Sequence, residues 1–313
     1  MDARAIVIEE PRKLALCDLS LQDPTDHDVV VDIETSGIST GTEKLLWSGR
    51  MPMFPGMGYP LVPGYESVGR VVEAGRLSGR AVGQRVFIPG ANCYRDVRGL
   101  FGGAASRVVV AGRKAARVDE TLGERAILLA LAATAHHAVR PDTRKPPELI
   151  VGHGVLGRLV ARIAVGCGGE PTVWETDAAR QAGSEGAYAV VHPDNDARRD
   201  YRRICDVSGD SGLLDMLVAR LARGGEINLA GFYDQRLSFA FPPAFMREAR
   251  IRVSAEWAQD DLDAVTALIG ADKLRLDGLI THVAAPEAFD EAYTTAFTDP
   301  SCLKMVLDWR QAA

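Results

Sequence analysis

The residues with the clearest chemical potential form a glycine-rich hexapeptide near the middle of the chain. It has the pattern G-x-G-x-x-G and consists of Gly152, His153, Gly154, Val155, Leu156 and Gly157. Glycines with this spacing allow a tight turn, close approach of a pyrophosphate, and close packing of a helix on a strand. The helix that follows would add unpaired N–H groups and a positive dipole end. We interpret the loop as a dinucleotide-binding site in which the backbone, more than the His153 ring, contacts the ligand.

A carboxylate at the end of the next strand supports this interpretation. Glu175 lies 23 residues after Gly152, close to the spacing of about 20 that is typical of an acid that binds the adenosine ribose. Together with Asp177 it would repel a 2′-phosphate, which favours NAD over NADP. Arg158 and Arg180 are the nearby cations, and surface positions on helices would account for both. The alternative is a glycine-rich turn without any ligand.

Strands and helices must alternate to position such a loop, and the second half of the chain shows this alternation. An apolar strand over 149–151 precedes a helix whose apolar residues recur with helical spacing. The further elements expected are a strand over 171–174, a helix from about residue 178, strands over 189–191 and 204–207, a helix over 213–221 and a strand over 226–230. This order predicts a doubly wound parallel α/β sheet. Residues 1–120 instead consist of short strands separated by glycine and proline.

Composition limits the function classes. The 313 residues carry 36 basic and 42 acidic side chains, and a net charge of −6 argues against a nucleic-acid partner. The longest apolar run, over 126–135, is about half of what crosses a bilayer, and no secretory signal is recognisable. The five cysteines are scattered and never spaced as C-x-x-C, which indicates a reducing compartment. These features predict a cytoplasmic protein without a transmembrane segment.

Metal-binding patterns are absent from the sequence. Neither C-x-x-C nor H-E-x-x-H occurs, and the six histidines do not cluster. His136 and His137 are adjacent on an expected helix, so we expect them to point to different faces, one packed and one at the surface.

The charged run over 198–203 is interpreted as a solvated surface, with anion binding as the alternative.

Several further motifs resemble a known family when they are taken together. They are Ser36-Gly37-Ile38-Ser39-Thr40-Gly41-Thr42-Glu43, Pro63-Gly64-Tyr65-Glu66, Gly83-Gln84-Arg85-Val86, Leu279-Ile280-Thr281-His282, Glu291-Ala292-Tyr293 and Leu303-Lys304. In this order, and with the glycine loop between them, they resemble the medium-chain dehydrogenase/reductase superfamily across essentially the whole chain. The resemblance implies a GroES-like, β-rich catalytic domain over 1–123 with 283–313, and a Rossmann domain over 124–282.

Departures from the superfamily pattern are informative. Its zinc enzymes carry cysteine, histidine and cysteine as catalytic ligands, where this chain has Ser39, Tyr65 and Ala130. Such side chains do not suit Zn²⁺, so we expect a zinc-free branch with no metal ligands. The motifs are most similar to the branch that oxidises the 3-(1-hydroxyethyl) group of a bacteriochlorophyllide, a magnesium tetrapyrrole, to 3-acetyl with NAD in bacteriochlorophyll biosynthesis.

Proton-handling candidates occupy the positions of the missing metal ligands. Oxidation of a secondary alcohol needs a hydride acceptor and a group that takes or relays the hydroxyl proton. We expect Tyr65 and Ser39 to serve there, with Thr42, Glu43 and Glu66 nearby in sequence. An unperturbed tyrosine titrates near pH 10, so Tyr65 would need a cationic or hydrogen-bonding neighbour to act as a base. The alternative is that these side chains only stabilise turns and the fold.

A loop rich in proline, glycine, methionine and aromatics precedes Pro63. A chlorin is flat and apolar, so it needs an open apolar cleft. Trp47, Met53, Phe54 and Tyr59 are the predicted substrate-binding residues, because aromatic rings stack on conjugated systems and methionine is adaptable. Packing of the same residues against the domain core is the alternative.

Two other functions are consistent with the same motifs. One is a zinc-free quinone or enone reductase that uses NADPH, and the other is a dinucleotide-binding sensor without turnover. Assembly into a homo-oligomer is left open by the sequence.

Overall fold

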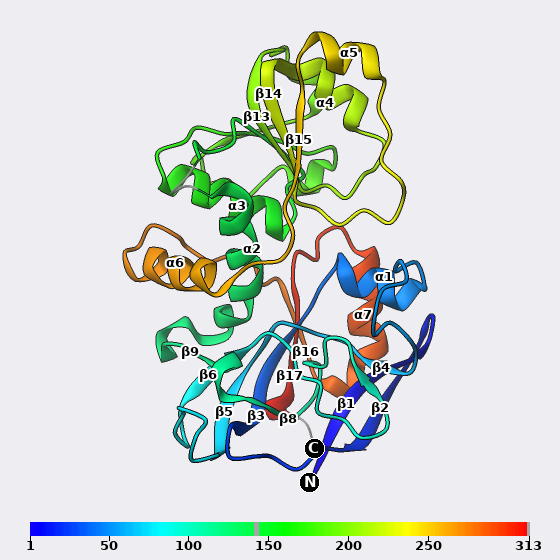
Figure 1. The fold of residues 1–313 in the computed structure, drawn as a ribbon, viewed down its shortest axis with the longest axis vertical. Coiled ribbons are helices and arrows are strands. Elements are labelled where there is room, and N and C mark those ends of the chain that lie inside the picture. Colours follow the sequence, from blue (N-terminus) through cyan, green and yellow to red (C-terminus); the bar gives the residue numbers. More distant parts are fainter. Residues whose placement is uncertain (141–143, 312–313) are drawn as a thin grey trace. The chain divides into compact units, whose positions relative to one another are not determined.

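The computed structural model describes residues 1–140 and 144–311. The chain divides into two compact units, Met1–Ala130 with Leu279–Ala313, and Leu131–Gly278 (Figure 1). The sequence placed the division at 123/124 and 282/283. Part of the difference is the 3₁₀ segment Glu120–Leu128, which packs on strands of the first unit. Among the described residues, no helix combines the length and apolarity needed to cross a bilayer.

The first unit contains two β-sheets. The smaller has the order β2-β1-β4-β7, and the larger has the order β16-β17-β3-β5-β6-β9 with β8 also paired to β3. Their strands are β1 (Asp2–Glu10), β2 (Lys13–Ser20), β3 (Asp28–Ile38), β4 (Leu61–Val62), β5 (Ser67–Ala74), β6 (Arg85–Ile88), β7 (Arg98–Gly99), β8 (Arg107–Ala111), β9 (Ala116–Arg117), β16 (His282–Ala284) and β17 (Met305–Asp308). The unit's helices are α1 (Thr42–Ser48) and α7 (Phe289–Thr298). This β-rich unit is the domain expected from the N-terminal motifs.

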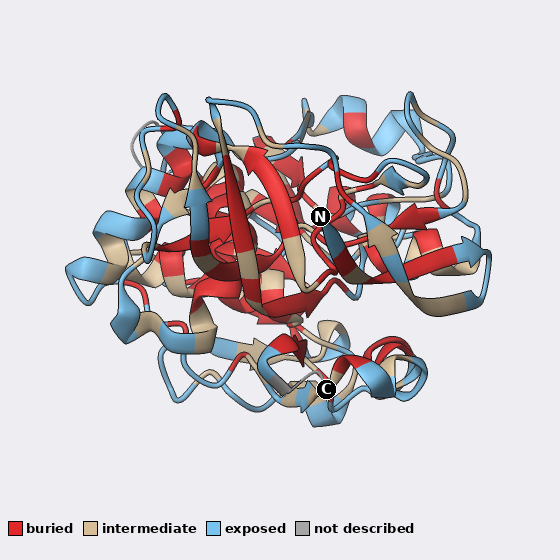
Figure 2. Ribbon diagram, turned by 90° about the horizontal axis from the view of Figure 1, so that it is seen from below, coloured by how far each residue is buried: buried red, intermediate tan, exposed pale blue. Residues whose placement is uncertain are grey.

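Strand β3 lies in the middle of the larger sheet, where it pairs with β17, β5 and β8. Many of its residues are β-branched. Val29, Val31 and Ile33 are buried in the apolar core, as β-branched side chains on a strand with a covered face usually are. Figure 2 marks the buried parts of the ribbon in red. Strand β17, from the far end of the chain, pairs antiparallel with β3 so that Met305 lies opposite Ile38. The C-terminal segment therefore completes the sheet that carries the Ser39 end of β3.

The second unit is built on one parallel sheet. Its order is β12-β11-β10-β13-β14-β15, and every neighbouring pair is parallel. The strands are β10 (Leu149–Val151), β11 (Thr172–Trp174), β12 (Ala189–Val191), β13 (Tyr201–Asp206), β14 (Leu221–Leu229) and β15 (Arg250–Val253). The helices are α2 (Leu129–Val139), α3 (Val155–Gly166), α4 (Leu214–Arg220), α5 (Phe241–Met246) and α6 (Gln259–Gly270). The order runs outward from β10 in one direction and from β13 in the other, which is the doubly wound topology expected.

One predicted helix of this unit is wrong. From Ala178 the chain makes only a single 3₁₀ turn, Ala178–Arg180, before it reaches β12. Gly183 and Gly186 then have φ of +95° and +79°, a left-handed conformation in which a helix cannot continue. Other short 3₁₀ segments are Gly112–Lys114, Pro193–Asn195, Pro286–Ala288 and Trp309–Gln311.

Candidate functional site

The glycine loop leads from the end of β10 into α3. Gly152 has φ of +101°, which only glycine adopts without strain. A Cβ on Gly157 would lie 1.9 Å from the Gly152 carbonyl oxygen, so a side chain there would separate the helix from the strand. A Cβ on Gly154 would meet no atom within 4 Å, because this residue faces open space. The first and third glycines therefore hold the turn together, and the second leaves room for a ligand to approach the backbone.

Glu175 lies beside this loop immediately after β11. Its Oε2 accepts a hydrogen bond from the His153 backbone N–H at 3.0 Å, and its Oε1 accepts one from the Asp177 N–H at 2.9 Å. An ionised carboxylate has about four lone-pair sites, so acceptor capacity remains on each oxygen. The half-buried side chain is thus oriented by the loop and can still accept hydrogen bonds from ribose hydroxyls. Of the other loop residues, Val155 is buried and Leu156 is half-buried.

The His153 ring departs from the sequence interpretation, in which only the backbone mattered. The ring is fully buried, with Nδ1 2.6 Å from the Arg180 carbonyl oxygen and Nε2 2.9 Å from the Tyr188 hydroxyl. Burial lowers the pKa of His153, which keeps the ring neutral. Sequence reasoning missed Tyr188, because nothing in the local pattern connects it to a loop 35 residues earlier.

Arg158 also departs from its predicted surface position on a helix. It is buried, and its guanidinium donates to three carbonyl oxygens. Nε donates to His153 at 3.1 Å, and Nη2 donates to Arg180 at 3.1 Å and to Ala182 at 2.8 Å. Burial lowers the pKa of this group. Its donors are therefore directed at the protein backbone.

In the first unit, the structure brings together three of the predicted catalytic side chains. The Ser39 hydroxyl, just past the end of β3, lies 2.6 Å from the Tyr65 hydroxyl. The Thr42 side chain, at the start of α1, also hydrogen-bonds to Tyr65. Gly64 adopts φ of +97°, and a Cβ there would lie 2.8 Å from the Ala104 backbone nitrogen. The glycine before Tyr65 is thus needed for the turn that points the phenol at Ser39.

The surroundings of Tyr65 disfavour its ionisation. Burial raises the pKa of the phenol, the negative charge of Glu66 raises it further, and the hydrogen bonds from Ser39 and Thr42 only partly offset this. Tyr65 therefore remains protonated at neutral pH. Tyr65 thus has two of the hydrogen-bonding neighbours that a base would need, but they do not lower its pKa below the ordinary value, so Tyr65 is suited to donate or relay a proton and unsuited to act as a phenolate base.

The same unit contains a set of buried charged and polar side chains, one of which, Glu66, is next in sequence to Tyr65. Glu66 accepts a 2.6 Å hydrogen bond from Lys304 Nζ, which also donates to the Ile38 carbonyl oxygen at 3.3 Å. Both charged side chains are at most 2% exposed. Glu66 Oε1 is buried without a hydrogen-bond partner. Sequence reasoning did not find this ion pair, although a single lysine in the apolar run from Cys302 to Leu307 was a signal of a buried partner.

Glu43 belongs to the same buried set. Its Oε1 accepts from the Ser39 backbone N–H at 3.0 Å, and its Oε2 is 3.1 Å from the Tyr293 hydroxyl. Burial raises the pKa of Glu43 to about 8, and the charge of Glu66 contributes to the increase. At neutral pH Glu43 is therefore mostly a neutral acid that fixes the backbone of Ser39.

These donors do not fit a zinc site. At the positions of the superfamily's ligands, Ser39 and Tyr65 present neutral hydroxyls that bond to each other, and Ala130 presents a methyl group. The nearest carboxylate in sequence, Glu66, is already paired with Lys304. Over residues 1–140 and 144–311, no group of three or more His, Cys, Asp or Glu side chains is arranged to hold a metal.

The predicted substrate residues differ in how far they are exposed. Met53 is 81% exposed, whereas Trp47, Phe54 and Tyr59 are half-buried and pack against an apolar cluster that includes Leu46. The Tyr59 hydroxyl donates to the Leu46 carbonyl oxygen. Three of the four residues thus contact the domain's own core, and only Met53 presents most of its surface to solvent.

The two adjacent histidines are not directed to different faces. His136 Nδ1 and His137 Nδ1 each lie 2.8 Å from a different oxygen of Asp261 on α6. Burial opposes ionisation of Asp261, but the hydrogen bonds from the Ala258 N–H and both histidines leave its pKa lowered. One carboxylate therefore binds both rings, and the pair connects α2 to α6.

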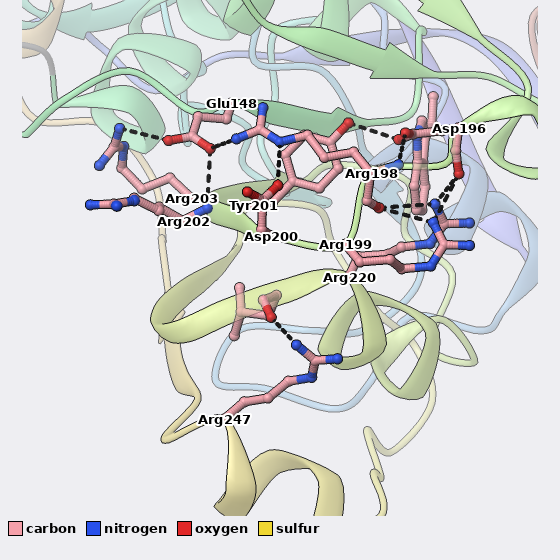
Figure 3. Close-up of polar contacts among 12 residues, drawn as sticks. Glu148, Asp196, Arg198, Arg199, Asp200, Tyr201, Arg202, Arg203, Arg220 and Arg247 are labelled. Atoms are coloured by element: carbon pink, nitrogen blue, oxygen red, sulfur yellow. Dashed lines mark hydrogen bonds and ion pairs between the residues drawn. The ribbon is translucent and has the colours of Figure 1, made fainter.

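The charged run Arg198–Arg203 is held largely by internal contacts (Figure 3). Glu148 accepts from Arg198 at 2.6 Å and from Arg203 at 3.2 Å, and the Arg198 guanidinium also lies over the Tyr201 ring at 4.3 Å. Much of the positive charge is thus neutralised within the unit. This arrangement gives no support to the alternative of an anion site.

Comparison with known proteins agrees with this architecture. Residues 25–120 match the alcohol dehydrogenase GroES-like domain. The chain is 53% identical, over the full length of both proteins, to the 2-desacetyl-2-hydroxyethyl bacteriochlorophyllide A dehydrogenase of Cereibacter sphaeroides. Its fold matches that of an Escherichia coli alcohol dehydrogenase in complex with NADH, with a TM-score of 0.83, 19% identity, and 98% and 99% of the two chains covered.

A second solved structure with the same fold is a dehydrogenase from Sinorhizobium meliloti bound to NADP. Its TM-score is 0.82 at 19% identity, with 98% of this chain and 99% of that chain covered. At this identity the two solved structures establish the fold alone. The chain belongs to the medium-chain dehydrogenase/reductase superfamily and, within it, to the family of 2-desacetyl-2-hydroxyethyl bacteriochlorophyllide A dehydrogenases.

Proposed function

We propose that this protein oxidises the 3-(1-hydroxyethyl) group of a bacteriochlorophyllide to 3-acetyl, with NAD⁺ as the hydride acceptor. The observation that carries the proposal is the 53% identity, over both full lengths, to a dehydrogenase named for that substrate. The glycine loop with Glu175 supports a nicotinamide cofactor, since its second glycine is open where a pyrophosphate would approach. Bound NAD⁺ would supply the hydride-accepting carbon of the reaction.

The cofactor is proposed to be NAD rather than NADP. Glu175 carries a negative charge where a 2′-phosphate would lie, and Asp177 follows two residues later. The nearby cation Arg158 donates to the carbonyls of His153, Arg180 and Ala182 and so is not directed at a phosphate. Calorimetry should show tighter binding of NADH than of NADPH, and the reverse order would refute this assignment.

Proton transfer is proposed to use the hydroxyl groups of Ser39 and Tyr65. Removal of a hydride from the carbinol carbon leaves the hydroxyl proton to be transferred, and a pair of hydroxyls 2.6 Å apart can relay it toward solvent. Thr42 orients the phenol, while Glu43 and the Glu66–Lys304 pair fix the backbone and charge behind it. Because the macrocycle activates a benzylic-like alcohol, this modest assistance would suffice without a metal.

Zinc independence is tested by metal analysis. Purified, tag-free protein should contain well under one equivalent of zinc, and activity should survive a strong chelator. Stoichiometric zinc that is lost together with activity would contradict the role given to Ser39 and Tyr65.

The activity is tested directly with the pigment. The protein is incubated with NAD⁺ and hydroxyethyl bacteriochlorophyllide, and the absorption of the pigment is followed together with formation of NADH. We expect one molecule of NADH to form for each molecule of pigment that is oxidised. Reduction of a quinone or enone by NADPH, with no change of the pigment, would favour the reductase alternative, and NADH binding without either reaction would favour a sensor.

The reaction is proposed to take place in the cytoplasm. Cys93, Cys205 and Cys302 are buried, and no two cysteines are spaced as C-x-x-C, as expected of a protein in a reducing compartment.

A further inference from the structure

The crossover from β11 to β12 lacks the α-helix that normally connects parallel strands and packs on the sheet. Residues 176–188 contain one 3₁₀ turn, and three residues with left-handed φ follow it, Gly183, Glu185 and Gly186. Such a segment has few backbone hydrogen bonds of its own, so side chains must hold it in place. The proposed dinucleotide site borders this segment, because Glu175 immediately precedes it.

Two side chains supply most of the contacts between this segment and the glycine loop. Arg158 donates to the carbonyl oxygens of Arg180 and Ala182, and a Cβ on Gly183 would lie 1.9 Å from its Nη1. The His153 ring contacts Arg180 and Tyr188, at either end of the part that contains the left-handed residues.

The tautomer of His153 follows from these partners. A carbonyl oxygen can only accept, so Nδ1 carries the proton and donates to Arg180 at 2.6 Å. The neutral ring then has an acceptor at Nε2, and the Tyr188 hydroxyl donates to it at 2.9 Å. The Tyr188 and His153 rings also meet edge to face, with centroids 5.6 Å apart. Each ring nitrogen therefore has one partner in the segment.

The same histidine orients the carboxylate of the site. Its backbone N–H donates to Glu175 Oε2, and the Gln181 side chain donates to the Glu175 carbonyl oxygen at 3.0 Å. The ring and the backbone of His153 thus connect three parts of the pocket, namely the loop, the acid and the segment over 176–188.

We propose that His153 is a positioning residue of the dinucleotide site, whose ring ties the glycine loop to residues 176–188 and keeps Glu175 in its ligand-binding orientation. The inference rests on the proposed cofactor site. It adds the roles of His153 and Tyr188, neither of which needs to touch the cofactor through its side chain.

Three substitutions separate the two ring contacts. In His153→Asn, the amide nitrogen takes the place of Nδ1 and can still donate to Arg180, but nothing reaches Tyr188. Tyr188→Phe removes the same hydrogen bond from the other side. His153→Leu removes both contacts. Since a hydrogen bond contributes about 0.5–1.5 kcal/mol, we expect about 2- to 13-fold weaker NADH binding in the first two variants and a larger loss in the third.

A double variant provides the critical comparison. If His153 and Tyr188 act through one shared bond, His153→Asn with Tyr188→Phe should bind NADH about as weakly as either single variant. The matched control is Tyr201→Phe, which removes a buried 2.7 Å hydrogen bond to Asp196 in the same unit. Tyr201 is the first residue of β13, whereas the glycine loop follows the last residue of the parallel strand β10. This control should lower the melting temperature and leave NADH affinity unchanged.

The readouts are the Kd for NADH by calorimetry, the melting temperature without cofactor, and the steady-state constants. A positioning role predicts a raised KM for NAD⁺ with nearly unchanged kcat, and a parallel loss of affinity for AMP, which carries the adenosine half. Unchanged NADH affinity in His153→Leu, or equal affinity losses in the Tyr201→Phe control, would overturn the inference. Failure of the unaltered protein to bind NADH would refute the proposed cofactor site itself.

Discussion

Replacing Glu43 with glutamine tests how the hydroxyl groups of the first unit are supported. The neutral acid accepts from the Ser39 N–H and can donate to the Tyr293 hydroxyl, and a glutamine amide can make the same two contacts. The substitution therefore retains the geometry and removes only the ability to ionise. Any change in stability with pH should then be attributable to the carboxyl group.

The size of the effect follows from the pKa of Glu43. Burial raises it from 4.5 to about 8, so the folded protein retains a proton that the unfolded chain has released. Stability from this group is complete below pH 4.5 and is lost as the pH rises toward 8. Between these two pKa values, each pH unit lowers the contribution of Glu43 to the free energy of unfolding by about 1.4 kcal/mol. From pH 5.5 to 7.5, the contribution of Glu43 to the free energy of unfolding should fall by about 2.5 kcal/mol, because the slope decreases as the pH approaches 8.

Urea unfolding at several pH values measures this difference. We expect the stability advantage of Glu43→Gln over the unaltered protein to grow by about 2.5 kcal/mol between pH 5.5 and pH 7.5. Glu73→Gln, which removes an exposed carboxylate on β5, is the control and should not show this gain. Parallel pH curves for the Glu43 variant and the unaltered protein would refute the reasoning.

Other substitutions test the remaining parts of the first unit. Lys304→Met should lower the free energy of unfolding by about 3–5 kcal/mol in urea titrations, because it leaves the buried Glu66 without its cation, and further replacement of Glu66 by Gln should restore part of the loss. Tyr65→Phe should reduce kcat about 100-fold or more without changing the Kd for NADH, and unchanged kcat would remove Tyr65 from proton relay. Met53→Ala should weaken pigment binding at constant melting temperature, whereas Trp47→Ala should lower the melting temperature as well, since Trp47 packs on the core. A lower melting temperature of Met53→Ala would instead indicate that Met53 packs against the domain core.

The parts of the site that depend on local pattern could be predicted from the sequence. The glycine loop needs only a strand, three glycines and a helix in order, and its expected place after β10 is confirmed. The pairing of Ser39 with Tyr65 was approached through the superfamily resemblance and not through spacing, because 26 residues separate them.

The other features could not be predicted from the sequence, because they depend on contacts between distant residues or on contacts that compete with local propensity. The Lys304–Glu66 pair spans 238 residues, and no periodicity in either segment indicates it. The predicted helix near Ala178 was favoured by a run of good helix formers, Ala178-Ala179-Arg180-Gln181-Ala182. In the structure, the carbonyls of Arg180 and Ala182 are instead hydrogen-bonded by Arg158. Tertiary hydrogen bonding therefore outweighed local propensity.

The assembly of the first unit from both ends of the chain sets an order of events during synthesis. Ribosomes add about 5–20 residues per second, so the 238 residues between Glu66 and Lys304 separate the two by a time on the order of tens of seconds. During that interval β3 lacks β17 on one edge, and Glu66 has no cation. The second unit is continuous in sequence and can fold first. We therefore expect a nascent chain that stops before Lys304 to contain a folded second unit and a protease-sensitive first unit, which is completed only after Lys304 and β17 have been synthesised.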